Sequence, residues 1–168
     1  MYPQHGYVPL ANGGYEQVTV GVAQNANPVS KGHCSAFNLP NAYGRNFTVQ
    51  KGFDPRVEGY LYGWNFQEQW DRAIGMDPEL IFVTGWNEYI GMWLPKDNWT
   101  GDPFSFVDQY NWNCSRDIEP NKGWGDKGDV YYLQLVDNVR RFKGMDKPEI
   151  ASEPKTIHLG RLGSWDDV

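Results

Sequence analysis

The stretch LIFVTGWNEY, residues 80–89, decides the predicted fold of this 168-residue chain. Its first seven residues form a nearly continuous apolar run of strand length, which is typical of a parallel strand buried on both faces. The run stops at Asn87 and Glu88. An amide and a carboxylate therefore stand at the C-terminal end of the predicted strand.

A second strand is predicted upstream, at residues 17–23. The sequence QVTVGVA places its valines on one face, as expected for a half-buried strand. Gln24 and Asn25 follow directly. This strand is therefore also expected to present polar side chains at its C-terminal end.

Each predicted strand is followed by a long irregular loop and then by a predicted helix. Asn65 is expected to cap the first helix, with Glu68 completing a capping box, and Gly75 ends it. Asp129 is expected to cap the second helix, and Gly144 closes it. Helical spacing places one apolar face on Phe66, Trp70, Ala73 and Ile74, and another on Tyr132, Leu135, Val136, Val139 and Phe142.

The order of strand, long loop and helix occurs twice, with both loops at C-terminal ends of strands. This order is typical of a (β/α)8 barrel, which needs eight such units and roughly 250 residues. Val, Leu, Ile and Phe make up about 21% of the chain, so the expected core is thin. The predicted fold class is therefore α/β, with residues 1–144 as the C-terminal portion of an incomplete TIM-type barrel with long βα loops. Residues 145–168 are expected to be a linker toward a following module. The alternative is a small self-contained α/β domain.

Composition excludes several classes of protein. The net charge of −6, without a cluster of Lys and Arg, argues against nucleic-acid binding. No apolar run is long enough for a membrane span, and the first twenty residues do not resemble a signal peptide. Three scattered histidines and two cysteines offer no metal site, and no cofactor is expected. Cys34 and Cys114 could form one disulfide or remain free thiols.

Glu88 is the central candidate for chemistry, because partial burial at a strand end and the neighbouring amide of Asn87 would tune its pKa. The structural alternative is a salt bridge with Arg116 or Arg45. The following loop holds four of the eight tryptophans, whose rings could bind the apolar face of a pyranose. Alternatively, they pack with the loop's own glycines and prolines as a small satellite core. These four are Trp93, Trp99, Trp112 and Trp124.

Three runs occur in a characteristic order: FVTGWNEY at 82–89, SRDIEP at 115–120 and GDVYYLQLVDNVRRFKG at 128–144. Together they resemble the C-terminal part of the barrel in glycoside hydrolase family 99-like proteins. That group includes the WbsX-like polysaccharide-biosynthesis proteins and many secreted bacterial glycosidase-like proteins. The resemblance covers about residues 63–144 and, more loosely, the segment VTVGVAQN.

The family pattern is similar to W-N-E-W-x-E-G followed by an L/I-E-P motif. The resemblance implies that Glu88 acts on the sugar as the first glutamate and that a second glutamate, three residues later, is the general acid. Gly91 stands at that second place in this chain. Because glycoside cleavage needs two carboxyl groups about 5–10 Å apart, Asp117 or Glu119 is expected to substitute.

The resemblance thus implies a glycoside hydrolase-like protein that cleaves O-glycosidic bonds of an oligosaccharide or polysaccharide, located outside the cell or in the periplasm. Two alternatives stay open. One is a non-catalytic carbohydrate-binding or surface protein that lost the acid at Gly91, and the other is an inactive barrel fragment. The expected catalytic residues are Glu88, Asp117 and Glu119, and the expected substrate-binding residues are Gln24, Asn25, Trp86, Asn87, Trp93, Trp112 and Arg116.

Overall fold

The computed structural model describes residues 7–23, 43–87, 90, 93–95, 104–106 and 111–145. Two α-helices and seven short strands occur in this part of the chain, together with 3-10 segments at Gly59–Tyr62 and Lys122–Lys127. The elements are β1 (Tyr7–Pro9), β2 (Tyr15–Val20), β3 (Phe47–Thr48), β4 (Gly52–Phe53), α1 (Trp64–Gly75), β5 (Leu80–Val83), β6 (Trp93–Pro95), β7 (Phe104–Phe106) and α2 (Val130–Phe142).

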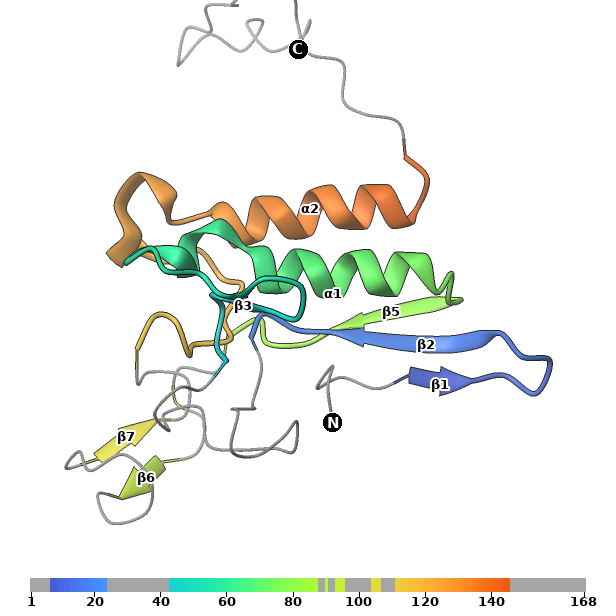
Figure 1. Ribbon diagram of the computed structural model, residues 1–168, viewed down its shortest axis with the longest axis horizontal. Coiled ribbons are helices and arrows are strands. Elements are labelled where there is room, and N and C mark those ends of the chain that lie inside the picture. The colour runs from blue at the N-terminus through green and yellow to red at the C-terminus, as the bar shows by residue number, and fades with distance from the viewer. Residues whose placement is uncertain are drawn as a thin grey trace, which may run out of the picture.

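A three-stranded sheet in the order β1-β2-β5 organises the described residues. β1 runs antiparallel to β2, whereas β2 and β5 are parallel, with Val18 opposite Ile81 and Val20 opposite Val83. The C-terminal ends of β2 and β5 therefore lie at the same edge, as the two predicted strands required. Figure 1 shows α1 and α2 side by side along one face of this sheet.

The core lies between that face and the two helices. Val18, Val20 and Val22 are fully buried, which confirms the predicted inward face of the upstream strand. From α1 the buried apolar residues are Phe66, Trp70 and Ala73, and Ile74 packs at their margin, also as predicted.

The inward face of α2 differs in part from the prediction. Leu135, Val139 and Phe142 do pack against the core. Tyr132 and Val136, however, are exposed, and the fully buried positions are Tyr131 and Asn138. The reason is that α2 packs against α1 partly through polar side chains, and Asn138 is buried where it exchanges hydrogen bonds with Gln67 of α1. Apolar spacing alone therefore places the buried face incorrectly.

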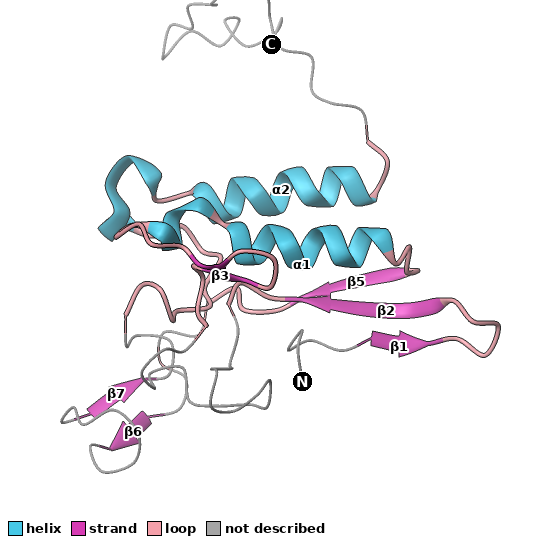
Figure 2. Ribbon diagram, in the orientation of Figure 1, coloured by secondary structure: helices cyan, strands magenta, loops and turns pink. Residues whose placement is uncertain are grey.

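The predicted barrel is wrong for the described residues. They contain a small mixed sheet with an antiparallel edge strand, and two short hairpins, β3-β4 and β6-β7, that pair separately from it. Figure 2 shows both helices on one side of the three-stranded sheet. Leu80 and Phe82 point to the other side and are 50% and 52% exposed. The run at 80–86 is thus apolar on both faces, but the described elements cover only one of them.

The helix starts also depart from the expected capping. α1 begins at Trp64, after Gly63 in the left-handed conformation, so Asn65 lies inside the helix. The Asn65 amide donates to the carbonyl of Phe47, and Glu68 accepts from the backbone N–H groups of Val49 and Gln50. Both residues of the expected capping box therefore hold the β3-β4 hairpin against α1. Asp129 occupies the N-cap position of α2 without a side-chain capping bond.

The described part of the chain contains no helix with the length and apolar character that a membrane crossing requires. α2 ends at Phe142, and Gly144 follows with a positive φ of 66°, as predicted for a helix C-terminus. The predicted linker at 145–168 lies outside the described residues except for Met145.

Candidate functional site

The end of β5 is joined to the SRDIEP segment by backbone hydrogen bonds. The N–H of Ile118 donates to the carbonyls of Gly85 and Trp86, at 3.0 and 3.2 Å, and the N–H of Glu119 donates to Trp86 at 3.0 Å. Gly85 has a positive φ of 79°, which turns the chain sharply out of the strand. The two motifs named for the resemblance therefore meet at the C-terminal edge of the sheet.

Asn87 and Glu119 form the polar centre of this edge. The Asn87 side-chain amide donates to Glu119 Oε2 at 2.6 Å. Asn87 is exposed and Glu119 is half-buried, so the pair is open to solvent. This hydrogen bond orients one carboxylate oxygen of Glu119. Glu88, the predicted central residue, follows Asn87 in the sequence and lies outside the described residues.

Arg45 belongs to a loop that is distant in the sequence, and its side chain holds the SRDIEP segment in place through hydrogen bonds. Its Nε donates to the Ser115 carbonyl at 2.7 Å, and its Nη2 donates to Ser115 Oγ at 2.9 Å and to the Asp117 carbonyl at 2.8 Å. The guanidinium carbon lies 5.0 Å from the ring centroid of Trp124 and 4.3 Å from that of Tyr131. Arg45 is buried, so these contacts replace part of its hydration, whereas its Nη1 has no hydrogen-bond partner among the described residues.

Asp117 is a structural carboxylate in this arrangement. Only 3% of its surface is exposed, and its Oδ2 accepts from Ser115 Oγ at 2.9 Å. Its carbonyl is bound by Arg45. A substrate in solvent cannot reach a carboxylate that is covered in this way. Of the two acids predicted in SRDIEP, Glu119 is therefore the accessible one.

The predicted tryptophans have different surroundings. Trp86 is 49% exposed, and its ring lies 6.1 Å from Tyr132 of α2 in an edge-to-face arrangement. Trp112 and Trp93 are also exposed, and Trp93 belongs to β6. Trp124 is buried in the core, as the satellite-core alternative expected. Trp86 directly precedes Asn87 in the sequence, and its ring pairs with that of Tyr132.

Two features of the site were absent from the predicted set. The sequence suggests Arg45 as a salt-bridge partner of Glu88 or as a hydrogen-bonding group for sugar hydroxyls, and no sequence pattern indicates its structural role. Tyr132 was assigned to the core because of its helical spacing. Arg116, predicted to bind substrate, is half-buried, and its carbonyl approaches Gly85. The predicted residues outside the described part of the chain are Gln24, Asn25, Glu88 and Trp99.

Cys114 lies beside Arg45 as a buried free thiol, consistent with the free-thiol alternative. Cys34 is outside the described residues. Burial raises the pKa of Cys114 to about 11, against opposing effects of a hydrogen bond with Asn111 and the charge of Arg45. The described residues contain no group of three or more His, Cys, Asp or Glu that could hold a metal ion.

The raised pKa predicts a specific loss of stability at alkaline pH. The folded state disfavours the Cys114 thiolate. The buried neutral thiol therefore contributes fully to the free energy of unfolding below about pH 9, and this contribution is lost as the pH rises toward 11. Between these values, the free energy of unfolding of the native protein should fall more than that of Cys114→Ala, by up to about 2–3 kcal/mol. Urea titrations of both proteins at pH 8, 9, 10 and 11 measure the difference, and parallel curves would contradict it.

Comparison of the chain with protein-family models, with curated proteins and with solved structures finds no match.

Proposed function

We propose that the protein binds an oligosaccharide or polysaccharide at the C-terminal edge of β2 and β5 and hydrolyses an O-glycosidic bond there. The hydrogen bond between Asn87 and Glu119 carries the proposal, because it joins the strand-end motif to the I-E-P motif in an open position. The α/β sheet edge, rather than a barrel, is the scaffold. Neither an organic cofactor nor a metal ion takes part in the proposed reaction.

The chemistry needs one carboxyl group to protonate the glycosidic oxygen and another to assist attack at the anomeric carbon. Glu119 is proposed as the acid, since it is the accessible carboxylate of its segment and Asn87 orients it. Glu88 is proposed as the base, nucleophile or stabilising carboxylate. The side-chain carbonyl oxygen of Asn87 can also accept a hydrogen bond from a sugar hydroxyl.

Aromatic side chains support a sugar rather than another polar substrate. The half-exposed rings of Trp86 and Tyr132 pair with one another, and the backbone carbonyl of Trp86 accepts the N–H of Glu119. Such rings bind the apolar C–H face of a pyranose, while amides and carboxylates bind its hydroxyls. An aromatic pair, an amide and a carboxylate are thus the reason for proposing a carbohydrate as the substrate.

Glu119→Gln tests the catalytic role directly. Glutamine keeps an oxygen that accepts from Asn87 but cannot donate the proton, so reducing-end release from a cleaved polysaccharide should fall at least 100-fold. The melting temperature should stay close to that of the native protein. Glu79→Gln is the matched control, because Glu79 is an exposed glutamate at the opposite end of β5, and it should cleave normally.

The same assay separates the enzyme from the carbohydrate-binding alternative, which Gly91 favours because the resemblance places the second glutamate there. Affinity electrophoresis on a panel of polysaccharides identifies a bound polymer first. Retention that depends on Trp86, without any release of reducing ends, would establish a binding protein. Full cleavage by Glu119→Gln would remove Glu119 from the mechanism.

A further inference from the structure

A cavity of about 480 Å³ lies away from this edge, between α1 and the turn that joins β3 to β4. Its helical wall consists of positions 64, 67, 68, 71 and 72, which recur on one face of α1. Its other wall comes from Thr48, Gln50 and Lys51. The volume falls within the range of small-molecule sites. The cavity shares no residue with the Asn87–Glu119 pair.

The hairpin wall is held rigidly against the helix. Both carboxylate oxygens of Glu68 accept backbone N–H groups of the turn, from Val49 at 2.9 Å and from Gln50 at 3.2 Å. The N–H of Lys51 donates to Thr48 Oγ1 at 3.1 Å, which closes the turn. The cavity is therefore formed before any ligand binds, and a ligand would not have to order its walls.

Two cationic side chains, Lys51 and Arg72, line the cavity. The Lys51 ammonium lies 4.1 Å from the ring centroid of Trp64, which holds it over the helix. Among the described residues, neither Lys51 nor Arg72 forms an ion pair. The Glu68 oxygens are already bound to the turn. An anionic group on a ligand would thus meet two cations that form no salt bridge with a carboxylate of the described residues, while the charge of Lys51 also acts on Asp54.

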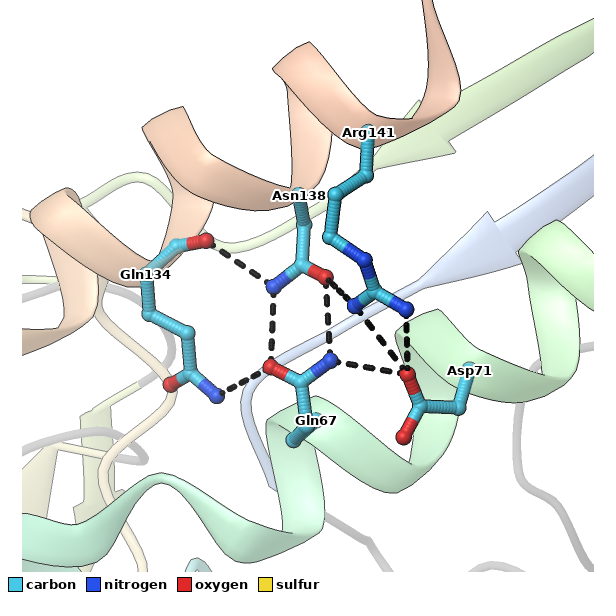
Figure 3. Close-up of polar contacts among 5 residues, drawn as sticks. All are labelled: Gln67, Asp71, Gln134, Asn138 and Arg141. Carbon is cyan, nitrogen blue, oxygen red and sulfur yellow. Dashed lines mark hydrogen bonds and ion pairs between the residues drawn. The ribbon is translucent and has the colours of Figure 1, made fainter. Parts of the chain in front are cut away.

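The cavity also offers groups that suit hydroxyls. Figure 3 shows that one oxygen of Asp71, Oδ1, receives the hydrogen bonds from Gln67 and Arg141, while Asp71 Oδ2 receives none of those drawn. The Asp71 side chain is 55% exposed. The Gln50 amide is exposed as well and adds a donor and an acceptor. Trp64 provides the apolar wall.

We propose that this cavity binds an acidic sugar, that is, a pyranose carrying a carboxylate. The carboxylate contacts Lys51 and Arg72, and the ring hydroxyls bind Asp71 Oδ2 and Gln50. The carbon face of the sugar packs along the Trp64 side of the cavity. The assignment is independent of the hydrolytic site, because no residue is common to both.

D-glucuronate is the probe, and binding to the full chain is measured by isothermal titration calorimetry at low ionic strength. The double variant Lys51→Gln/Arg72→Gln should weaken binding at least tenfold. Lys122→Gln is the matched control, since Lys122 is an exposed cation outside the cavity, and it should bind normally. Lys51→Arg keeps the charge and should stay within about threefold of the native protein.

Two further ligands and one further variant complete the test. D-glucose, which lacks the carboxylate, and acetate, which lacks the hydroxyls, should each bind at least tenfold more weakly than D-glucuronate. Glu119→Gln should bind D-glucuronate normally, so failure of the hydrolytic proposal leaves this one standing. The proposal is overturned if D-glucuronate does not bind saturably, if the double variant binds it normally, or if acetate binds equally well.

Discussion

Arg45→Met is expected to lower the free energy of unfolding by about 4 kcal/mol and the melting temperature by roughly 10 °C. Methionine fills a similar length but donates no hydrogen bond. The carbonyls of Ser115 and Asp117 would then be buried without the donor that now reaches them from 70 residues away in the sequence. Chemical denaturation followed by tryptophan fluorescence measures the loss.

Arg72→Met is the matched control for this change, because Arg72 is a cation on α1 that forms no ion pair with described residues. Its stability should change by less than about 0.5 kcal/mol. A loss below about 1 kcal/mol in Arg45→Met would mean that other contacts hold the SRDIEP segment. Polysaccharide retention should fall together with stability in Arg45→Met, because that segment carries Glu119.

Gly85→Ala is expected to cost about 3 kcal/mol of stability and to abolish polysaccharide binding. The φ of 79° at this position strains any residue that has a Cβ atom. That atom would also lie 2.5 Å from the carbonyl oxygen of Arg116. Because the obstacle is backbone, residues 118–119 would have to move away from the end of β5.

Gly52→Ala separates the effect of backbone strain from the effect of the close approach to the Arg116 carbonyl. Gly52 has a similar φ of 72°, but a Cβ atom there would meet nothing within 4 Å. It should therefore cost only about 1–2 kcal/mol, from backbone strain alone, and it should leave polysaccharide binding unchanged. Equal losses of stability in the two variants would show that the Arg116 segment adapts without disturbing the fold.

Only part of the candidate site could be predicted from the sequence. Asp117 or Glu119 was expected to complete the site that begins at the strand end, and the SRDIEP segment does form backbone hydrogen bonds with Gly85 and Trp86 there. The sequence slightly favoured Asp117, because Glu119 could instead orient a loop or pair with Arg116. Burial separates them, because Ser115 and Arg45 enclose Asp117 and leave Glu119 beside Asn87. The catalytic roles of both glutamates stay predictions.

The fold was predictable where a pattern is local. Alternating valines gave the buried face of β2, and helical spacing gave the inward face of α1. The predicted capping box is wrong because the side chains of Asn65 and Glu68 bind the β3-β4 hairpin instead of the backbone of their own helix. The barrel failed because apolar residues on both faces of 80–86 indicated burial on both sides, whereas Leu80 and Phe82 are exposed.

Short-range periodicity by itself determined the strands β2 and β5 and the two amphipathic helices, since side-chain direction repeats along each element. The tertiary structure alone decided which strands share a sheet and that a distant arginine supports SRDIEP. It also decided that a cavity lined by Lys51 and Arg72 lies against α1. These features depend on contacts between residues 18 to 72 positions apart. Such contacts leave no periodic signal, because their geometry arises only when the elements pack.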